Sequence, residues 1–194
     1  TREHVIPAFI HRFQKELEKN VIGWNEAAKK MVGGEHQVKD VCRTCNGGVL
    51  SNLDAFGKKF LITNGFLTQN YTKREADLTY DYNQLVRWLL KISFNSTRTN
   101  SDHTHLFEKF IPYILEGTPS PKKTDFAVVA TLAAPVTTEE LGGDYQALQA
   151  LADESGRVNP FFMRISYGPN RYETFTLRVV MFGPLLFFLL MYVP

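Results

Sequence analysis

The chain has 194 residues, of which 44% are hydrophobic and 22% are charged, and its formal net charge is +2. This length suits one large domain or two small ones, and the composition is that of a globular protein and excludes a disordered chain. A net charge this small permits nucleic-acid binding without arguing for it. Any such binding therefore requires a local basic patch.

The first 65 residues alternate between short extended runs and helical runs. Residues 1–7 are expected to form a strand or extended loop that ends at Pro7, and residues 8–18 carry apolar side chains at helical spacing. Residues 19–36 are polar and contain three glycines, which predicts a crossing loop with at most one helical turn. A short strand near residues 38–41 then leads through a cysteine turn into a helix from residue 48 to about residue 61.

A helical segment is predicted for residues 66–117. Asp81 is the expected N-cap of a helix that ends near Phe94, and the polar residues 95–101 predict a break after it. A second helix is expected from Asp102 to Gly117, with Pro112 kinking or shortening it.

The remainder of the chain, residues 118–194, favours β-structure. After a proline-containing linker at residues 118–124, strands are predicted at residues 126–132, 161–167 and 172–182, with a hairpin signal at residues 168–170. Residues 141–153 stay ambiguous, with a short helix as one interpretation. The uncharged run 179–193 is interrupted by Gly183 and Pro184 and falls short of the roughly 20 residues of a membrane helix, so it predicts a buried strand pair. The alternative is a truncated membrane span that anchors the C-terminal end.

Two short motifs near the start carry the chemistry of the chain. The first is Glu3-His4-Val5-Ile6-Pro7, and the second is Cys42-Arg43-Thr44-Cys45-Asn46-Gly47-Gly48. Carboxylate and amide oxygens can hold a hard divalent cation, and an imidazole beside them can take a proton from water. The cysteine pair has the spacing of half a zinc site, whereas the βαβ pattern that surrounds redox motifs of this spacing is not seen around it.

The order of these motifs, about 40 residues apart, resembles the HNH endonuclease family. The stretch from Cys45 to Asp54 is also similar to a C-N-x-G-x-x-S-x-L-[ED] pattern of its zinc-bearing subgroup. The resemblance implies a ββα-metal fold with His4 as the general base and with Glu3 and Asn46 as ligands of a catalytic Mg²⁺ or Mn²⁺. It places Gln37 where many members have an asparagine that orients the histidine, with His36 as an alternative.

The resemblance also concerns zinc. In the subgroup, a second C-x-x-C lies before the first motif, so Cys42 and Cys45 would be two of four structural zinc ligands. Because that second pair would lie before Thr1, we expect the chain to be truncated at its N-terminus. Replacement of the missing ligands by His11 or His36 is the alternative, and two small, partly buried thiols without metal are another. Such thiols fit a reducing cytoplasm.

Together these features predict an α+β protein with an HNH-like module (residues 1–65), a helical segment (66–117) and a β-rich region of unassigned role (118–194). The resemblance implies divalent-metal-dependent hydrolysis of DNA, with Arg43, Lys58 and Lys59 near the phosphates. The alternative is a non-catalytic nucleic-acid- or protein-binding module with the same fold. Each motif residue also has a structural interpretation: His4 and Glu3 as surface residues, Asn46 as a helix cap, and the basic residues as a solvated face.

Overall fold

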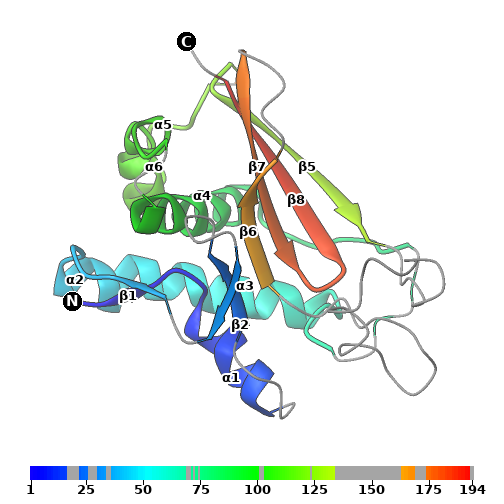
Figure 1. Ribbon diagram of the computed structural model, residues 1–194. Helices are drawn as coiled ribbons and strands as arrows, with labels where there is room; N and C mark the ends of the chain where they lie inside the picture. Colours follow the sequence, from blue (N-terminus) through cyan, green and yellow to red (C-terminus); the bar gives the residue numbers. More distant parts are fainter. Residues whose placement is uncertain are drawn as a thin grey trace.

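The computed structural model describes residues 1–16, 22–25, 30–33, 36–68, 71, 73, 75–100, 103–122, 124–133, 163–168 and 174–192. Within these ranges helices are combined with small antiparallel sheets (Figure 1), so the general α+β class is confirmed. Residues 141–153 and most of the expected 168–170 hairpin signal lie outside the described residues.

The N-terminal part contains two separate strand pairs. Strand β1 (Glu3–His4) pairs antiparallel with β4 (Gln37–Val38), and helix α1 (Ala8–Glu16) begins just after Pro7, as predicted. The crossing-loop prediction for residues 19–36 was wrong, because β2 (Ile22–Asn25) and β3 (Lys30–Gly33) pair antiparallel. Four-residue runs are too short to show a period of two, and only the partner strand reveals them.

The segment after the cysteine pair is helical from an earlier point than predicted. It consists of α2 (Arg43–Cys45), the π-helical turn η1 (Asn46–Leu50) and α3 (Ser51–Thr63), with a kink at Gly48. The Cys42 Sγ accepts a hydrogen bond of 3.1 Å from the Cys45 backbone N–H and so caps the first turn. A cysteine takes the place of the usual oxygen-bearing N-cap residue here.

Helix α4 (Tyr82–Asn100) begins at the predicted N-cap, since Asp81 Oδ1 accepts a hydrogen bond from the Gln84 backbone N–H at 3.0 Å. The predicted break at residues 95–101 was wrong, because the described helix continues to Asn100. Asn95, Ser96 and Thr97 are buried, and their polar groups are satisfied, as in the 3.2 Å bond from Asn95 Nδ2 to the His4 carbonyl. Tertiary hydrogen bonds satisfy Asn95 and Ser96, and Thr97 bonds back to the Phe94 carbonyl within the helix, so these polar residues do not break it.

The helix predicted to run to Gly117 is divided in two. Helix α5 (His105–Glu108) is followed by α6 (Ile111–Glu116), and Pro112 lies in the first turn of α6, where a missing N–H is tolerated. Gly117 has a φ of 80° and ends α6, as predicted.

The C-terminal sheet has the strand order β5-β8-β7-β6 and is antiparallel throughout. Its strands are β5 (Phe126–Leu132), β6 (Met163–Tyr167), β7 (Phe175–Phe182) and β8 (Leu185–Tyr192). The uncharged run is therefore a strand pair that turns at Gly183 and Pro184, as predicted. In the described part of the chain, no helix is both long and apolar enough to cross a membrane.

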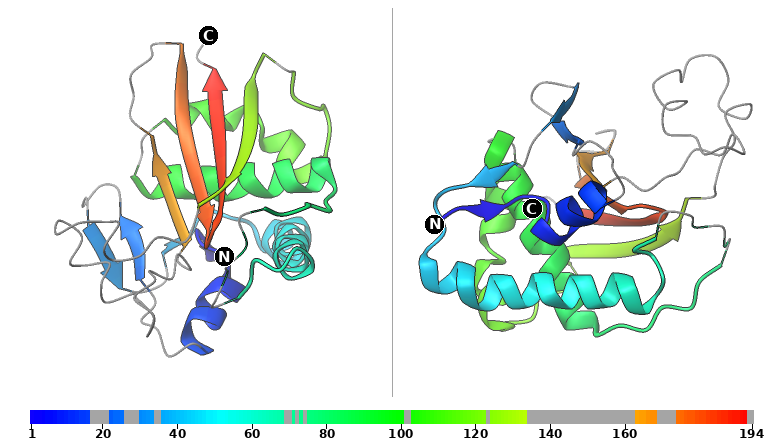
Figure 2. Two further views of the ribbon diagram at one scale, coloured as in Figure 1. Left: turned by 90° about the vertical axis from the view of Figure 1, so that its right-hand side faces the viewer. Right: turned by 90° about the horizontal axis from the view of Figure 1, so that it is seen from below.

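The main core lies where α4 crosses one face of this sheet (Figures 1 and 2). Alternate residues of β7 and β8, including Val180, Phe182 and Phe187, are buried on that face. Trp88 of α4 is fully buried and stacks on Phe182 with 4.6 Å between the ring centroids, which places it in the core. One hydrophobic cluster contains residues of all three predicted segments, so the core does not separate them. The domain boundaries 1–65, 66–117 and 118–194 therefore stay predictions.

Candidate functional site

His4 and Gln37 form the centre of the candidate site. They are directly opposite each other in the β1–β4 pair, and the two Nε2 atoms lie 3.0 Å apart. The neighbouring His36 contributes its backbone carbonyl, which accepts a hydrogen bond of 2.9 Å from the Val5 N–H. Of the two candidates for the middle motif residue, Gln37 is thus the one whose side chain contacts His4.

The donor and acceptor roles in this contact depend on the state of the His4 ring. An amide nitrogen can only donate and an amide oxygen can only accept, so the tautomer of the His4 ring decides which atom of the Gln37 amide faces Nε2. In either arrangement the contact with Gln37 holds the His4 ring in one orientation.

Glu3 has different surroundings from His4, because successive side chains of a strand point to opposite sides. It is buried, and its Oε1 lies 2.6 Å from the Nζ of Lys91, a residue of α4 that is also buried. The same Nζ lies 2.6 Å from Asp54 Oδ1 of α3 and donates to the Leu50 carbonyl at 3.3 Å. The expected metal ligand is therefore engaged by an ammonium group of the protein.

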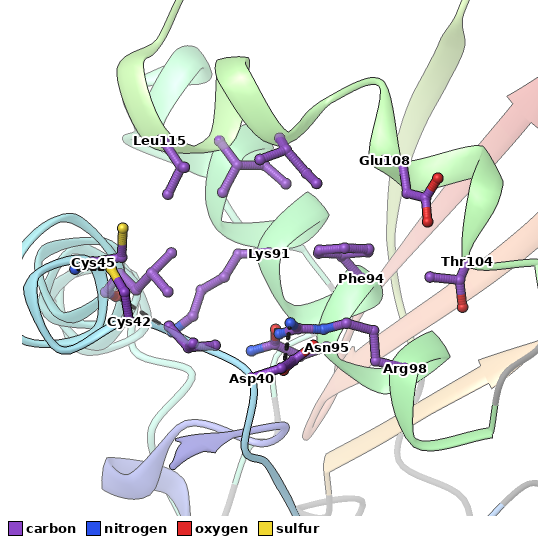
Figure 3. Close-up of a pocket in the computed structure, with 14 residues that line it drawn as sticks. Asp40, Cys42, Cys45, Lys91, Phe94, Asn95, Arg98, Thr104, Glu108 and Leu115 are labelled. Carbon is purple, nitrogen blue, oxygen red and sulfur yellow. Dashed lines mark hydrogen bonds and ion pairs between the residues drawn. The ribbon is translucent and has the colours of Figure 1, made fainter. Parts of the chain in front are cut away.

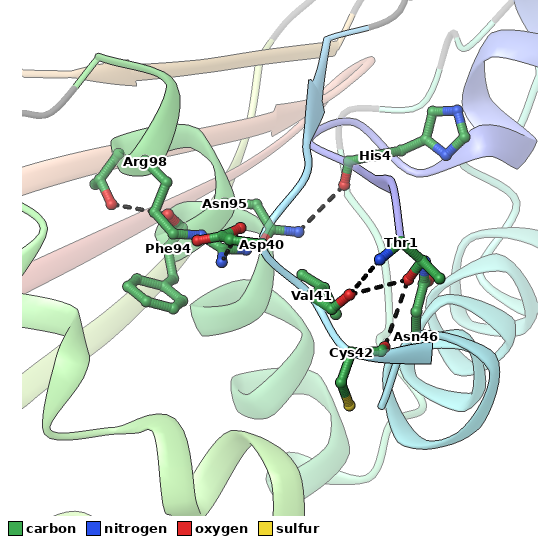
Figure 4. A network of polar contacts seen from close by, with 10 residues as sticks. Thr1, His4, Asp40, Val41, Cys42, Asn46, Phe94, Asn95 and Arg98 are labelled. Atoms are coloured by element: carbon green, nitrogen blue, oxygen red, sulfur yellow. Dashed lines mark hydrogen bonds and ion pairs between the residues drawn. The ribbon is translucent and has the colours of Figure 1, made fainter. Parts of the chain in front are cut away.

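Asn46 connects the start of the helical segment to the N-terminal strand. Its Nδ2 donates to the Thr1 hydroxyl at 2.9 Å and to the Arg2 carbonyl at 2.7 Å, which leaves the amide oxygen directed elsewhere. Figure 4 shows that the His4 ring points away from Asn46. The structure thus brings the two motifs side by side, but it does not bring Glu3, His4 and Asn46 around one point.

This arrangement does not fit a divalent metal. The Glu3 carboxylate is buried and paired with Lys91, so it cannot meet the Asn46 amide oxygen at a shared ion. Within the described residues there is no group of three or more His, Cys, Asp or Glu side chains that could hold a metal. A carboxylate and an amide are suitable ligand types for Mg²⁺ or Mn²⁺, but their positions here do not make a site.

Cys42 and Cys45 are free thiols, the first exposed and the second half-buried. The side-chain hydrogen bond from Cys45 lowers the pKa of Cys42, with the Cys45 backbone N–H adding to the effect, and the same side-chain contact raises the pKa of Cys45. No third metal-binding side chain joins them in the part of the chain that the structure describes, so His11 and His36 do not complete a zinc site there. The pair remains the predicted half-site.

The basic residues proposed for phosphate contact, Arg43, Lys58 and Lys59, are all exposed. A cavity of about 890 Å³ lies beside the cysteine pair, between residues 40–50, α4 and the α5–α6 segment (Figure 3). Lys91 and Arg98 of α4 line it, and neither was expected to matter from the sequence. The sequence held one indication that Lys91 is buried. Lys91 follows Trp88 by three residues, so the two share a helix face that is otherwise buried.

Comparison of the chain with protein-family models, with curated proteins and with solved structures finds no match. The function of the site therefore has to be argued from its own residues and their geometry.

Proposed function

We propose that this protein is an HNH-type endonuclease that hydrolyses phosphodiester bonds in DNA and depends on Mg²⁺ or Mn²⁺. The observation that supports this most is the 3.0 Å contact between His4 and Gln37 across the β1–β4 pair. It joins the histidine of the first motif to the residue nine positions before Asn46, which is the pair that the resemblance implies.

The position of the second motif supports the same proposal. Asn46 lies at the start of the helical segment and binds the Arg2 carbonyl at 2.7 Å, next to the first motif. Two antiparallel strands are thus followed by a helix whose beginning is tied to the first strand. This order is the one expected of a ββα module.

His4 is the proposed general base. It accepts a proton from water, the water oxygen forms a bond to phosphorus, and the bond from phosphorus to the leaving sugar oxygen breaks, with that oxygen taking a proton from solvent. The exposed side chains of Arg43, Lys58 and Lys59 are proposed to contact DNA phosphates. A bound metal ion would supply charge stabilisation at the phosphate, but no step is assigned to it because Glu3 and Asn46 do not form a site in this arrangement.

The first test is nicking of supercoiled plasmid by the wild type, by His4→Ala and by His105→Ala, which changes an exposed histidine outside the site. We expect the wild type to nick with Mg²⁺ or Mn²⁺ and to stop with a chelator. Loss of the general base should lower the rate by about 100-fold or more, whereas the His105 variant should keep it.

DNA binding measured by gel shift separates the catalytic role of His4 from a role in binding. His4→Ala should bind plasmid as the wild type does, because the bond from Asn95 to the His4 backbone carbonyl is unaffected. Full nicking activity in His4→Ala would show that His4 is not the general base.

The pairing of Glu3 with Lys91 favours a second candidate function, a non-catalytic nucleic-acid- or protein-binding module with the same fold. In that case the wild type would bind DNA or a protein without cleaving DNA under any metal condition. For both candidates we propose the cytoplasm as the location, since the free thiols of Cys42 and Cys45 persist in a reducing compartment.

A further inference from the structure

The ammonium group of Lys91 lies inside a set of three oxygen atoms. Glu3 Oε1 and Asp54 Oδ1 are each 2.6 Å from Nζ, and the Leu50 carbonyl oxygen is 3.3 Å away. The Lys91 side chain is 2% exposed and that of Glu3 is 6% exposed. A cation with its charge this deeply buried is stable only when oxygen ligands replace its water.

The three oxygens come from three elements, and Lys91 comes from a fourth. Glu3 belongs to β1, Leu50 to η1, Asp54 to α3 and Lys91 to α4. The indole Nε1 of Trp88 also donates to Asp54 Oδ1 at 3.1 Å, which fixes that carboxylate. Two carboxylates and one carbonyl are the ligand types that hard divalent cations bind in proteins. The two negative charges exceed the single positive charge that the ammonium supplies.

We propose that Glu3, Asp54 and the Leu50 carbonyl form a cation site that Lys91 fills with its own ammonium group, and that a divalent cation such as Mn²⁺ or Ca²⁺ binds there when this group is removed. In the wild type the lysine is an internal competitor, because a metal ion reaches Glu3 only when Lys91 withdraws. The inference does not depend on nuclease activity.

The cavity beside Lys91 reaches one of the three residues that supply these oxygens, Leu50. Lys91 and Leu50 both line the space of about 890 Å³ that lies next to the cysteine pair (Figure 3). We expect Lys91→Ala to open this space toward Glu3 and Asp54, which are not among its lining residues in the wild type. A cation can then arrive with part of its water shell and keep some of that water as ligands.

The test compares Mn²⁺ binding to the full chain by calorimetry in four forms: wild type, Lys91→Ala, Lys91→Ala with Glu3→Gln, and Lys109→Ala. Lys109 is the matched control, because it pairs with Asp125 at 2.9 Å but is 42% exposed. We expect Lys91→Ala to bind one Mn²⁺ at least about tenfold more tightly than the wild type. Adding Glu3→Gln should remove the gain, and Lys109→Ala should show none.

Thermal unfolding gives a second measurement, which tests the proposal even if the variant folds poorly without metal. Lys91→Ala leaves the buried Glu3 carboxylate and the half-buried Asp54 carboxylate without a cation, so its Tm should fall in the presence of a chelator and rise again with Mn²⁺. Sodium at the same ionic strength should not restore it.

Four results would overturn the proposal: no gain in affinity for Lys91→Ala, an equal gain for Lys109→Ala, a gain that survives Glu3→Gln, or a Lys91→Ala chain that stays unfolded with Mn²⁺. Each of these four results is measured by metal binding or by unfolding and does not require DNA cleavage. An absence of DNA cleavage in the wild type would instead contradict the proposed function and leave the cation site intact.

Discussion

Glu3 and His4 are neighbours in the chain, yet their side chains have different partners and different burial. Glu3 is buried against Lys91, and this ion pair holds β1 against α4. Removing one partner of such a buried pair typically costs about 3–5 kcal/mol, because the other charge is left without compensation. His4 is half-buried and meets the Gln37 amide at 3.0 Å, so its ring is positioned by a partner but keeps access to solvent.

The cysteine pair provides a test at the same scale. The pKa of Cys42 is lowered and that of Cys45 is raised, so Cys42 carries more thiolate at any pH near neutrality. Iodoacetamide should therefore label Cys42 faster than Cys45 when zinc has been removed with a chelator. The rate for Cys45→Ser, which keeps only Cys42, should reach half its maximum at a lower pH than the rate for Cys42→Ser.

Mass spectrometry of the labelled peptides measures both rates. Serine at position 45 keeps a hydroxyl donor for the Cys42 sulfur, so the lowering of the pKa should persist in that variant. Equal labelling of the two thiols over the whole pH range would contradict the assigned direction of the shifts.

At the scale of elements, helices α3 and α4 approach closely at one glycine. Gly57 is buried against the Trp88 ring, and a Cβ atom at this position would overlap Trp88 Cε2 and Cζ2. The neighbouring hydrogen bond from Trp88 to Asp54 keeps the ring from moving away. A side chain at position 57 must therefore push the two helices apart or displace the indole.

We predict that Gly57→Ala lowers the free energy of unfolding by about 1–3 kcal/mol, as overpacking of a dense core usually does. Urea unfolding followed by circular dichroism measures the change. Gly47→Ala is the control, since a Cβ atom there meets nothing within 4 Å, and its effect should stay within about 0.5 kcal/mol. Equal effects of the two variants would show that helix contact is not the cause.

At the scale of the whole molecule, Trp88 connects parts that are far apart in the sequence. Its ring stacks on Phe182 of the C-terminal sheet at 4.6 Å and on Phe9 of α1 at 6.5 Å. Helix α4 thereby joins the N-terminal motifs to the sheet through one hydrophobic cluster. We infer that the two ends of the chain unfold together.

Trp88→Ala should lower the free energy of unfolding by about 3–5 kcal/mol, because it removes the largest buried side chain at this junction. Far-UV circular dichroism and tyrosine fluorescence should show coincident transitions for both the wild type and the variant. Tyr82→Ala is the control on the same helix, since Tyr82 is 60% exposed, and should change stability by about 0.5 kcal/mol or less. Two separate transitions in the wild type would mean independent domains.

Local patterns in the sequence determined much of this protein. Helical spacing predicted α1, the N-cap residue Asp81 predicted the start of α4, and Gly117 predicted the end of α6. The strand pair at the uncharged tail followed from Gly183 and Pro184. The resemblance to the HNH family also offered Gln37, with His36 as the alternative, as the residue that orients His4, and the side chain of Gln37 is the one in contact with it. These features depend on residues close in the chain or on a fixed spacing between motifs, so they can be found without coordinates.

Tertiary structure alone decided the rest. The β2–β3 pair needed a partner strand, and α4 continues past Asn95 because the side chain of Asn95 reaches the carbonyl of His4. The pairing of Glu3 with Lys91 joins residues from opposite ends of the N-terminal half of the chain. A buried charge takes whichever opposite charge the fold brings to it, and no local pattern in the sequence records that choice.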